Sequence, residues 1–237
     1  MRSRPPVIVS VVAALAMLAG CAGFDAPGSG RAAEAPTYRV GDRWVYRAQD
    51  GFLTPVRWEE THEVVAIGGE GVTVRVTQRG PTLDAARTEQ WSAPGQVKIG
   101  ALYDSETRRF DAPLKRYEFP LAGGKIWNQW VGNANEATGK SGAINRYVRV
   151  RGWEQVTTPA GTFDAIAMDV IMHLDDDEFW RWPTDCSYAV WYAPAVRATV
   201  REAKDAQYRE RGDALDNGGV RTQHALLELV SFTPGKP

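Results

Sequence analysis

The first residues to test for chemistry form a loop that ends in Gly-Lys-Ser. Residues 134–141 read Ala-Asn-Glu-Ala-Thr-Gly-Lys-Ser, which satisfies a permissive phosphate-loop pattern. A real phosphate loop lies between a strand and a helix, so that backbone N–H groups and the helix N-terminus hold the phosphate. Here residues 143–148 alternate as a strand does. The sequence therefore predicts a polar hairpin loop, and we expect no nucleotide to bind.

The three histidines do not form a metal site. His62 and Glu63 begin like a zinc-protease helix, but the second ligand would fall at position 66, which is Ala66. One imidazole cannot replace two ligands. His173 and His224 have no ligand-like neighbours at useful spacing. We expect structural or surface histidines, no bound metal and no cofactor.

The densest acidic run is Asp-Asp-Asp-Glu at residues 175–178. Carboxylates suit calcium, but the register of an EF-hand is absent, so a solvated loop tip is expected. The chain has no Gly-x-Ser-x-Gly elbow and no evident Cys/His pair. Carboxylate pairs of the glycosidase type cannot be recognised by sequence. No catalytic residue is predicted, and a hydrolase with an unrecognised carboxylate site stays an alternative.

An aromatic segment follows the acidic run and includes Phe179, Trp180 and Trp182. Tryptophan is enriched at membrane and protein interfaces. These rings either cap the open end of a β core or form an interaction surface. Basic residues offer a second candidate surface: Arg149 and Arg151, with Arg146, Arg197 and Arg201, could line a strip that meets lipid phosphate or an anionic glycan. The alternative is an ordinary solvated face.

The N-terminus has the features of an export signal. Met-Arg-Ser-Arg is followed by an apolar run at residues 7–19, interrupted only by Ser10. These 13 residues are too few to cross a bilayer, which needs about 20. Leu18-Ala19-Gly20-Cys21 resembles the lipobox of bacterial lipoproteins.

The lipobox resemblance implies that residues 1–20 are removed and that Cys21 becomes the first residue. In that family the cysteine carries a thioether-linked diacylglycerol and usually an amide-linked acyl chain, which together hold a protein on the membrane. Ala22, where an Asp would retain a lipoprotein at the inner membrane, implies the periplasmic face of the outer membrane of a Gram-negative bacterium.

Composition bounds the remaining 217 residues. Loss of Arg2 and Arg4 leaves 26 basic and 29 acidic residues, a net charge of −3, which gives no field that would attract nucleic acid. Lipidation of Cys21 would leave Cys186 without an internal disulfide partner. Residues 21–37, rich in Gly, Ala and Pro, are predicted to be the lipidated cysteine and a flexible tether. Residues 38–237 are predicted to form a single β-rich domain.

Alternating apolar and polar residues predict strands throughout this domain. Val72, Val74 and Val76 share one face, as do Ile166 and Met168 with the apolar residues at 170 and 172. Glycines at 68–71 and Pro-Ala-Gly at 159–161 predict hairpin turns. Short strands are expected at 96–100 and 196–200, and a long closing strand at 220–232. The fold class is all-β, an antiparallel meander forming a curved sheet or half-barrel.

A weak internal repeat suggests two related halves, about 38–118 and 119–237. Trp-Ser-Ala-Pro at 91–94 recurs as Trp-Tyr-Ala-Pro at 191–194, and Gly-Asp-Arg-Trp at 41–44 has a looser echo in Gly-Gly-Lys-Ile-Trp at 123–127. The alternative is chance recurrence in a chain rich in tryptophan.

The motifs Gly-Asp-Arg-Trp-Val-Tyr (41–46), Pro-Leu-Ala-Gly-Gly-Lys-Ile-Trp (120–127), Thr-Pro-Ala-Gly-Thr-Phe-Asp-Ala (158–165) and Trp-Tyr-Ala-Pro together resemble a pattern in exported β-rich bacterial proteins of unknown function. Those proteins are similar in outline to the LolA/LolB class, in which a curved antiparallel sheet can shelter an acyl chain. The matched residues belong to turns and core, so the resemblance implies fold and compartment and carries over no binding residue.

Three functions follow as hypotheses. The first is a non-enzymatic envelope lipoprotein, anchored by its lipid, whose β domain binds a hydrophobic ligand or an envelope protein. The second is a structural or assembly accessory of an outer-membrane protein complex. The third is the hydrolase with an unrecognised carboxylate site.

Overall fold

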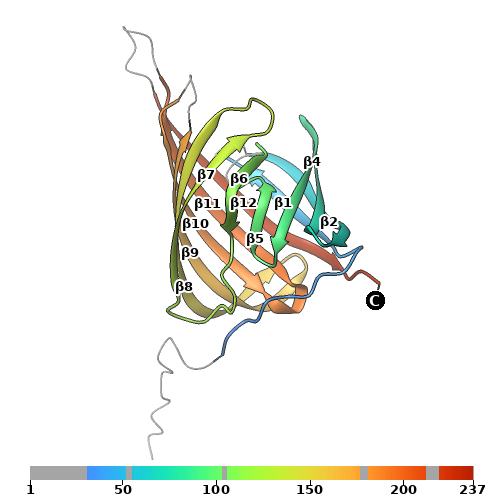
Figure 1. Ribbon diagram of the computed structural model, residues 1–237. Coiled ribbons are helices and arrows are strands. Elements are labelled where there is room, and N and C mark those ends of the chain that lie inside the picture. Colours follow the sequence, from blue (N-terminus) through green and yellow to red (C-terminus); the bar gives the residue numbers. More distant parts are fainter. Residues whose placement is uncertain (1–30, 52–54, 103–105, 177–180, 212–218, 237) are drawn as a thin grey trace, which may run out of the picture.

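The chain forms a closed antiparallel β-barrel (Figure 1). The computed structural model describes residues 31–51, 55–102, 106–176, 181–211 and 219–236. Within them, the strands are β1 (Arg43–Asp50), β2 (Val56–Gly68), β3 (Gly71–Gly80), β4 (Leu83–Ala93), β5 (Gln96–Gly100), β6 (Arg108–Lys115), β7 (Ile126–Asn135), β8 (Ser141–Thr158), β9 (Gly161–Asp176), β10 (Thr184–Ala193), β11 (Ala198–Arg209) and β12 (Val220–Thr233).

Each strand pairs with its neighbour in the sequence, and β12 returns to pair with β1. Trp44 of β1 lies opposite Phe232 of β12 on one side and opposite His62 of β2 on the other. The predicted all-β meander is confirmed, and the predicted closing strand does close it. Because β1 has a partner on each side, the curved sheet closes and goes beyond a half-barrel.

The predicted alternation decides which side chains fill the barrel. Val72, Val74 and Val76 of β3 are buried, and so are the alternate apolar residues of β9 from Ile166 to Leu174. The hairpin turns lie where Gly and Pro predict them: Gly68 pairs with Gly71, and Thr158 with Gly161. Residues 96–100 form β5 as expected.

One predicted strand begins later than expected. Residues 194–196 form the 3-10 turn η1 (Pro194–Val196), and β11 starts at Ala198. Pro194 occupies the first position of the turn, where its fixed φ is favourable. Arg197 then takes a left-handed conformation with φ of 59°. The prediction of a strand from residue 196 is wrong for this reason.

Aromatic rings close one end of the barrel. Trp44 stacks on Phe232, with ring centroids 5.6 Å apart, and Tyr38 meets the Trp44 ring edge-on at 6.0 Å. The segment between β6 and β7 adds Tyr117, whose ring lies 5.3 Å from that of Tyr192. Such edge-on and offset contacts are favourable because of the charge distribution of the rings. They fill the end of the barrel from which β1 begins.

The segment before β1 lies against the same end of the barrel, at the bottom of Figure 1. Ala33 forms a β-bridge with Leu121, and Trp153 Nε1 donates to the carbonyl of Arg31 at 2.9 Å. The Arg31 guanidinium lies 3.8 Å from the centroid of the Trp153 ring. The predicted tether of residues 21–37 therefore includes a part, residues 31–37, that contacts the barrel.

The proposed halves each contain six strands, β1–β6 and β7–β12. Trp91 lies in the fourth strand of the first run and Trp191 in the fourth strand of the second. Their side chains differ, because Trp91 is buried inside while Trp191 lies on the outer face and donates to Glu154 at 2.8 Å. Duplication stays a prediction.

Candidate functional site

A chamber of about 310 Å³ lies inside the barrel. Its wall comes from β1–β4, β11 and β12, together with residues 101–102 and 116–117. On the other side, β8, β9 and β10 fill the interior with their own apolar side chains. Small-ligand sites have volumes of about 300–1,000 Å³, so the chamber has the size of a small-molecule site.

The chamber is closed at one end and more accessible at the other. Trp44 and Tyr46, near the start of β1, are only 1% and 3% exposed. Asp50 at the end of β1, Trp58 at the start of β2 and Leu83 at the start of β4 are partly exposed. A ligand would therefore enter from the end where Asp50 lies.

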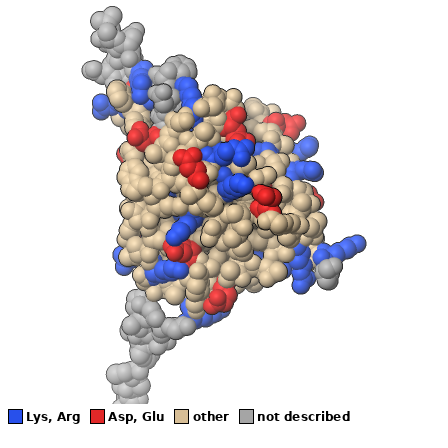
Figure 2. Space-filling view, in the orientation of Figure 1, with Lys and Arg blue, Asp and Glu red and all other residues tan. Residues whose placement is uncertain are grey.

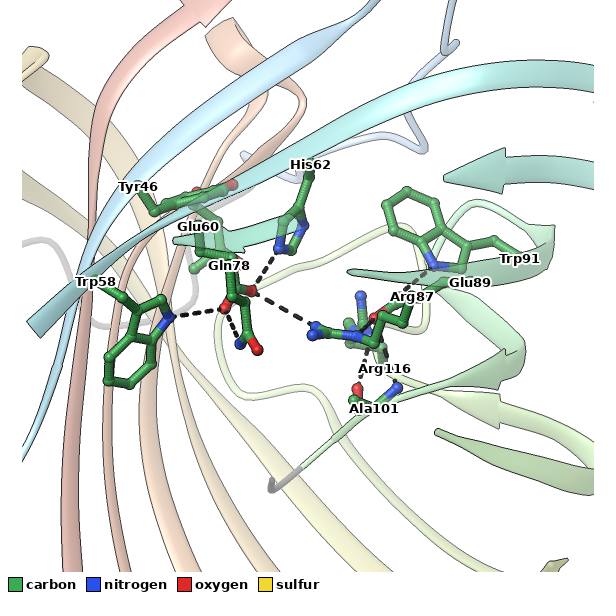
Figure 3. Close-up of polar contacts among 11 residues, drawn as sticks. Tyr46, Trp58, Glu60, His62, Gln78, Arg87, Glu89, Trp91, Ala101 and Arg116 are labelled. Atoms are coloured by element: carbon green, nitrogen blue, oxygen red, sulfur yellow. Dashed lines mark hydrogen bonds and ion pairs between the residues drawn. The ribbon is translucent and has the colours of Figure 1, made fainter. Parts of the chain in front are cut away.

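The carboxylate of Glu60 accepts several hydrogen bonds in the chamber wall (Figure 3). His62 Nε2 lies 2.6 Å from Oε1, while Gln78 Nε2 and Trp58 Nε1 donate to Oε2 at 2.6 and 3.3 Å. Arg87 adds an ion pair at 3.5 Å. Glu60, His62 and Trp58 alternate along β2, so the period of two places all three side chains on the inner face.

Glu89 forms the other half of this polar cluster. Arg87 Nε donates to its Oε1 at 3.1 Å, and Arg116 Nη2 and Trp91 Nε1 donate to Oε2 at 3.3 and 3.0 Å (Figure 3). Arg87 thus bridges Glu60 and Glu89. The side chain of Glu89 is 1% exposed, so its charge is balanced by the two arginines and not by water.

The two carboxylates are held ionised. Burial by itself would raise the pKa of each, because a charge is costly in a medium of low dielectric constant. For Glu60, hydrogen bonds from His62 and Gln78 and the charge of Arg87 outweigh burial, so its pKa lies well below the usual range. For Glu89, mainly the charges of Arg116 and Arg87 lower the pKa to about 2. Neither group carries a proton at neutral pH.

Arg146 positions the loop that supplies Arg116. Its Nη1 donates to the carbonyl oxygens of Lys115 and Arg116, at 2.8 and 3.1 Å. Tyr117 is anchored on the opposite side, where its hydroxyl forms a hydrogen bond with Thr199 of β11. Burial lowers the pKa of Arg146 to about 10, which leaves it charged at neutral pH. The β6–β7 segment is therefore held across the barrel end by contacts with two distant strands.

Only part of the predicted basic strip lies together: the guanidinium groups of Arg151 and Arg201 each lie 5.4 Å from the centroid of the Trp191 ring. Arg146 points into the barrel, whereas Arg149 is exposed on the outer face of the same strand. Arg151 pairs with Glu154 at 3.3 Å, and Arg201 contacts Glu228 at 3.9 Å. In Figure 2, acidic and basic side chains are interspersed over the face in view.

Trp182 and Arg149, one from each candidate interaction surface, lie apart on the barrel. Trp182 is 51% exposed and lies 4.6 Å from the guanidinium of Arg211. Arg149 pairs with Asp169, five residues before Leu174, which pairs with Thr184 near Trp182. At about 3.3 Å per residue this is roughly 17 Å along the strand, so Trp182 and Arg149 do not contact each other.

Phe179, Trp180 and Cys21 lie outside the described residues. An interaction surface that includes Trp182 stays a prediction, as does lipidation of Cys21. No helix among the described residues is long and apolar enough to cross a membrane.

The remaining sequence motifs lie in a turn and on the outer face of the barrel. The Gly-Lys-Ser motif forms the turn between β7 and β8, where Gly139 N donates to the carbonyl of Asn135 at 2.8 Å. This confirms the predicted hairpin loop. His173 and His224 lie on the outer face beside Asp185 and Asp205, at 2.8 and 2.6 Å. No group of three or more possible metal ligands occurs within the described part of the chain.

The cluster of Glu60, Arg87, Glu89 and Arg116 was not predicted from the sequence. Part of this cluster could have been predicted, because Arg87 and Glu89 alternate with Trp91 along β4 and therefore lie on the same inner face. Charged residues that alternate with a core tryptophan indicate a polar interior. Arg116 carries no such signal, because it lies in an irregular loop.

No protein-family model matches the chain, and no curated protein matches its sequence. Two solved structures are similar to it. A candidate exported protein with a YmcC-like fold from Bacteroides fragilis aligns with a TM-score of 0.50 and 11% identity, over 85% of this chain and 99% of that one. A candidate lipoprotein from Parabacteroides distasonis aligns with a TM-score of 0.49 and 12% identity, over 86% and 100% of the two chains. At this identity, the Bacteroides fragilis match shows a shared fold alone.

Proposed function

We propose that this chain is an exported, non-enzymatic lipoprotein, anchored through Cys21 to the outer membrane, whose barrel binds a small and mainly hydrophobic ligand. The chamber is the observation that carries the proposal. Tyr38, Trp44, Tyr46 and Leu227 give it an apolar and aromatic wall, while the cluster around Glu60 and Glu89 supplies fixed polar groups. A few oriented polar groups in an apolar wall are typical of ligand sites.

The compartment rests on sequence features. The charged start, the apolar run and the Leu-Ala-Gly-Cys motif support export and lipidation. The Bacteroides fragilis protein with this fold is itself a candidate exported protein, which supports export of this chain. The limited volume favours a small amphiphile over a long acyl chain.

Filling the chamber is expected to remove ligand binding. Ala225 lies on β12 opposite Asp50, and its side chain lines the accessible part of the chamber. Ala225→Phe would place a ring where the ligand enters. We expect at least about a tenfold loss of affinity, equivalent to about 1.4 kcal/mol. Native mass spectrometry of gently purified residues 22–237, which retain the whole described barrel, would measure the fraction with bound ligand.

Ala86→Phe is the matched control, because Ala86 is exposed on the outside of β4. It should keep the bound ligand. A wild-type chain without any bound small molecule, or an Ala225→Phe chain that retains it fully, would contradict the proposal.

A hydrolase is the second candidate, because carboxylates do converge in the chamber. Glu60 and Glu89 are both ionised, so neither suits a general acid. His62, 2.6 Å from Glu60, is the candidate base. Hydrolysis of chromogenic esters that falls at least about a hundredfold in His62→Asn would favour this function. The same rate in His62→Asn as in the wild type would exclude His62 from such a role.

A further inference from the structure

Glu202 differs from the other carboxylates that line the chamber. It lies on β11 opposite Leu227 of β12. Asp50 accepts a hydrogen bond from Gln223 at 2.6 Å, and the partners of Glu60 and Glu89 are described above. Among the described residues, the Glu202 carboxylate makes no hydrogen bond and no ion pair.

The arginines around the chamber are already engaged elsewhere. Arg87 and Arg116 pair with the Glu60–Glu89 cluster, and Arg197 Nη2 lies 2.6 Å from Asp42. Arg146 directs its Nη1 to main-chain carbonyls. The chamber wall therefore presents a carboxylate whose charge no directly contacting arginine neutralises.

Lys204 is the cation of β11 that lines the chamber with Glu202. Lys204 follows two residues later on the same face of β11, and its Nζ lies 5.6 Å from the centroid of the Tyr188 ring. Its contacts do not include an ion pair with Glu202 within the described chain. The Glu202 side chain is partly exposed and lines the chamber, so a ligand that covered it would have to balance its charge, which favours a positively charged ligand group.

Aromatic rings accompany this carboxylate. Tyr46 and Tyr117 both line the chamber. The hydroxyl of each forms its hydrogen bond with Thr199 and not with Glu202. The charge of Glu202 acts on Tyr46 and Tyr117 and also on Arg116, whose ion pair within the described chain is with Glu89. Aromatic faces together with a carboxylate favour binding of organic cations.

We propose that the chamber selects ligands that carry an ammonium group, with Glu202 as the residue that binds this group and Tyr46 and Tyr117 beside it. This inference rests on the proposed function, because it specifies the ligand class of the same chamber. The expected ligand is a small amine with an apolar or aromatic body.

Three probes of similar size and different charge test the assignment: 2-phenylethylammonium, 2-phenylethanol and 3-phenylpropionate. Isothermal titration calorimetry on residues 22–237 at neutral pH would measure each affinity. We expect the amine to bind about tenfold or more tightly than the alcohol, since hydrogen bonds to charged groups are the stronger ones. Glu202→Gln should abolish that preference, because the amide carries no charge to attract the ammonium group.

The control is Asp205→Asn on the outer face of the same strand, which should keep the preference. An unchanged midpoint of urea unfolding in Glu202→Gln would show that the barrel is still folded. Equal binding of all probes by the wild type, or an amine preference that survives in Glu202→Gln, would overturn the inference alone. Tighter binding of 3-phenylpropionate would overturn it in favour of Arg116. Absence of binding by every probe would overturn it together with the proposed chamber function.

Discussion

Glu89→Gln is expected to lower the free energy of unfolding by about 3–5 kcal/mol, the range for removing one partner of a buried ion pair. The amide keeps the shape of the side chain and can still accept from Trp91 Nε1. It removes the charge that faces Arg116, whose ion pair within the described chain is with Glu89. Arg87 would keep only the longer contact with Glu60, at 3.5 Å. Urea unfolding at pH 7, followed by tryptophan fluorescence, measures the change.

Glu70→Gln provides the control for this variant. Glu70 also pairs with a cation, Lys98 at 3.3 Å, but its side chain is 90% exposed. Exposed pairs are worth about 0–1 kcal/mol, so this change should have little effect. If both variants lost the same free energy of unfolding, the buried ion pairs of Glu89 would contribute no more to stability than an exposed pair. Apolar packing would then have to support the inner wall of the chamber.

Strand pairing was predictable because it depends on local patterns. Alternation identified the inner faces of β3 and β9, and Gly-rich turns set their hairpins. The apolar closing strand at 220–232 also follows from its length and pattern. Full closure did not follow, because it depends on the curvature summed over every strand and on a contact between β1 and β12, some 180 residues apart.

Arg146 does not belong to the predicted basic strip, because it lies on the inner face of β8. Side chains alternate with a period of two, so Arg146 and Arg149, three residues apart, cannot share a face of β8. Arg146 belongs with the buried Val148 and Val150. A charged residue on the core face of a strand is an informative signal, and here it marks the residue that holds the β6–β7 segment.

The chamber itself could be predicted only in part. Glu60 and Glu89 lie on inner faces that alternation can identify, but their convergence requires β2 and β4 to be brought together through β3. Arg116 reaches Glu89 from a loop 27 residues away. Glu202 lies on β11, which is brought next to β1 and β2 only by the pairing of β12 with β1. These placements depend on the barrel as a whole, which no local sequence pattern encodes.

The stabilising effect of Glu89 is expected to depend on pH. In the fold its pKa is about 2, below the ordinary 4.5, because Arg116 and Arg87 favour the ionised form despite burial. The unfolded chain therefore takes up the proton first as the pH falls. The contribution of this carboxylate to stability is complete above about pH 4.5 and is lost progressively towards pH 2.

The measurement is the difference in unfolding free energy between the wild type and Glu89→Gln, followed from pH 7 to pH 2.5. Taking a difference removes the effects of the other acidic residues, which are the same in both chains. We expect the difference to be largest at neutral pH and to shrink steadily below about pH 4.5. A difference that stayed constant across this range would mean that the effect of Glu89→Gln does not depend on charge. The charge of Glu89 would then not be what holds Arg87 and Arg116 in the chamber wall.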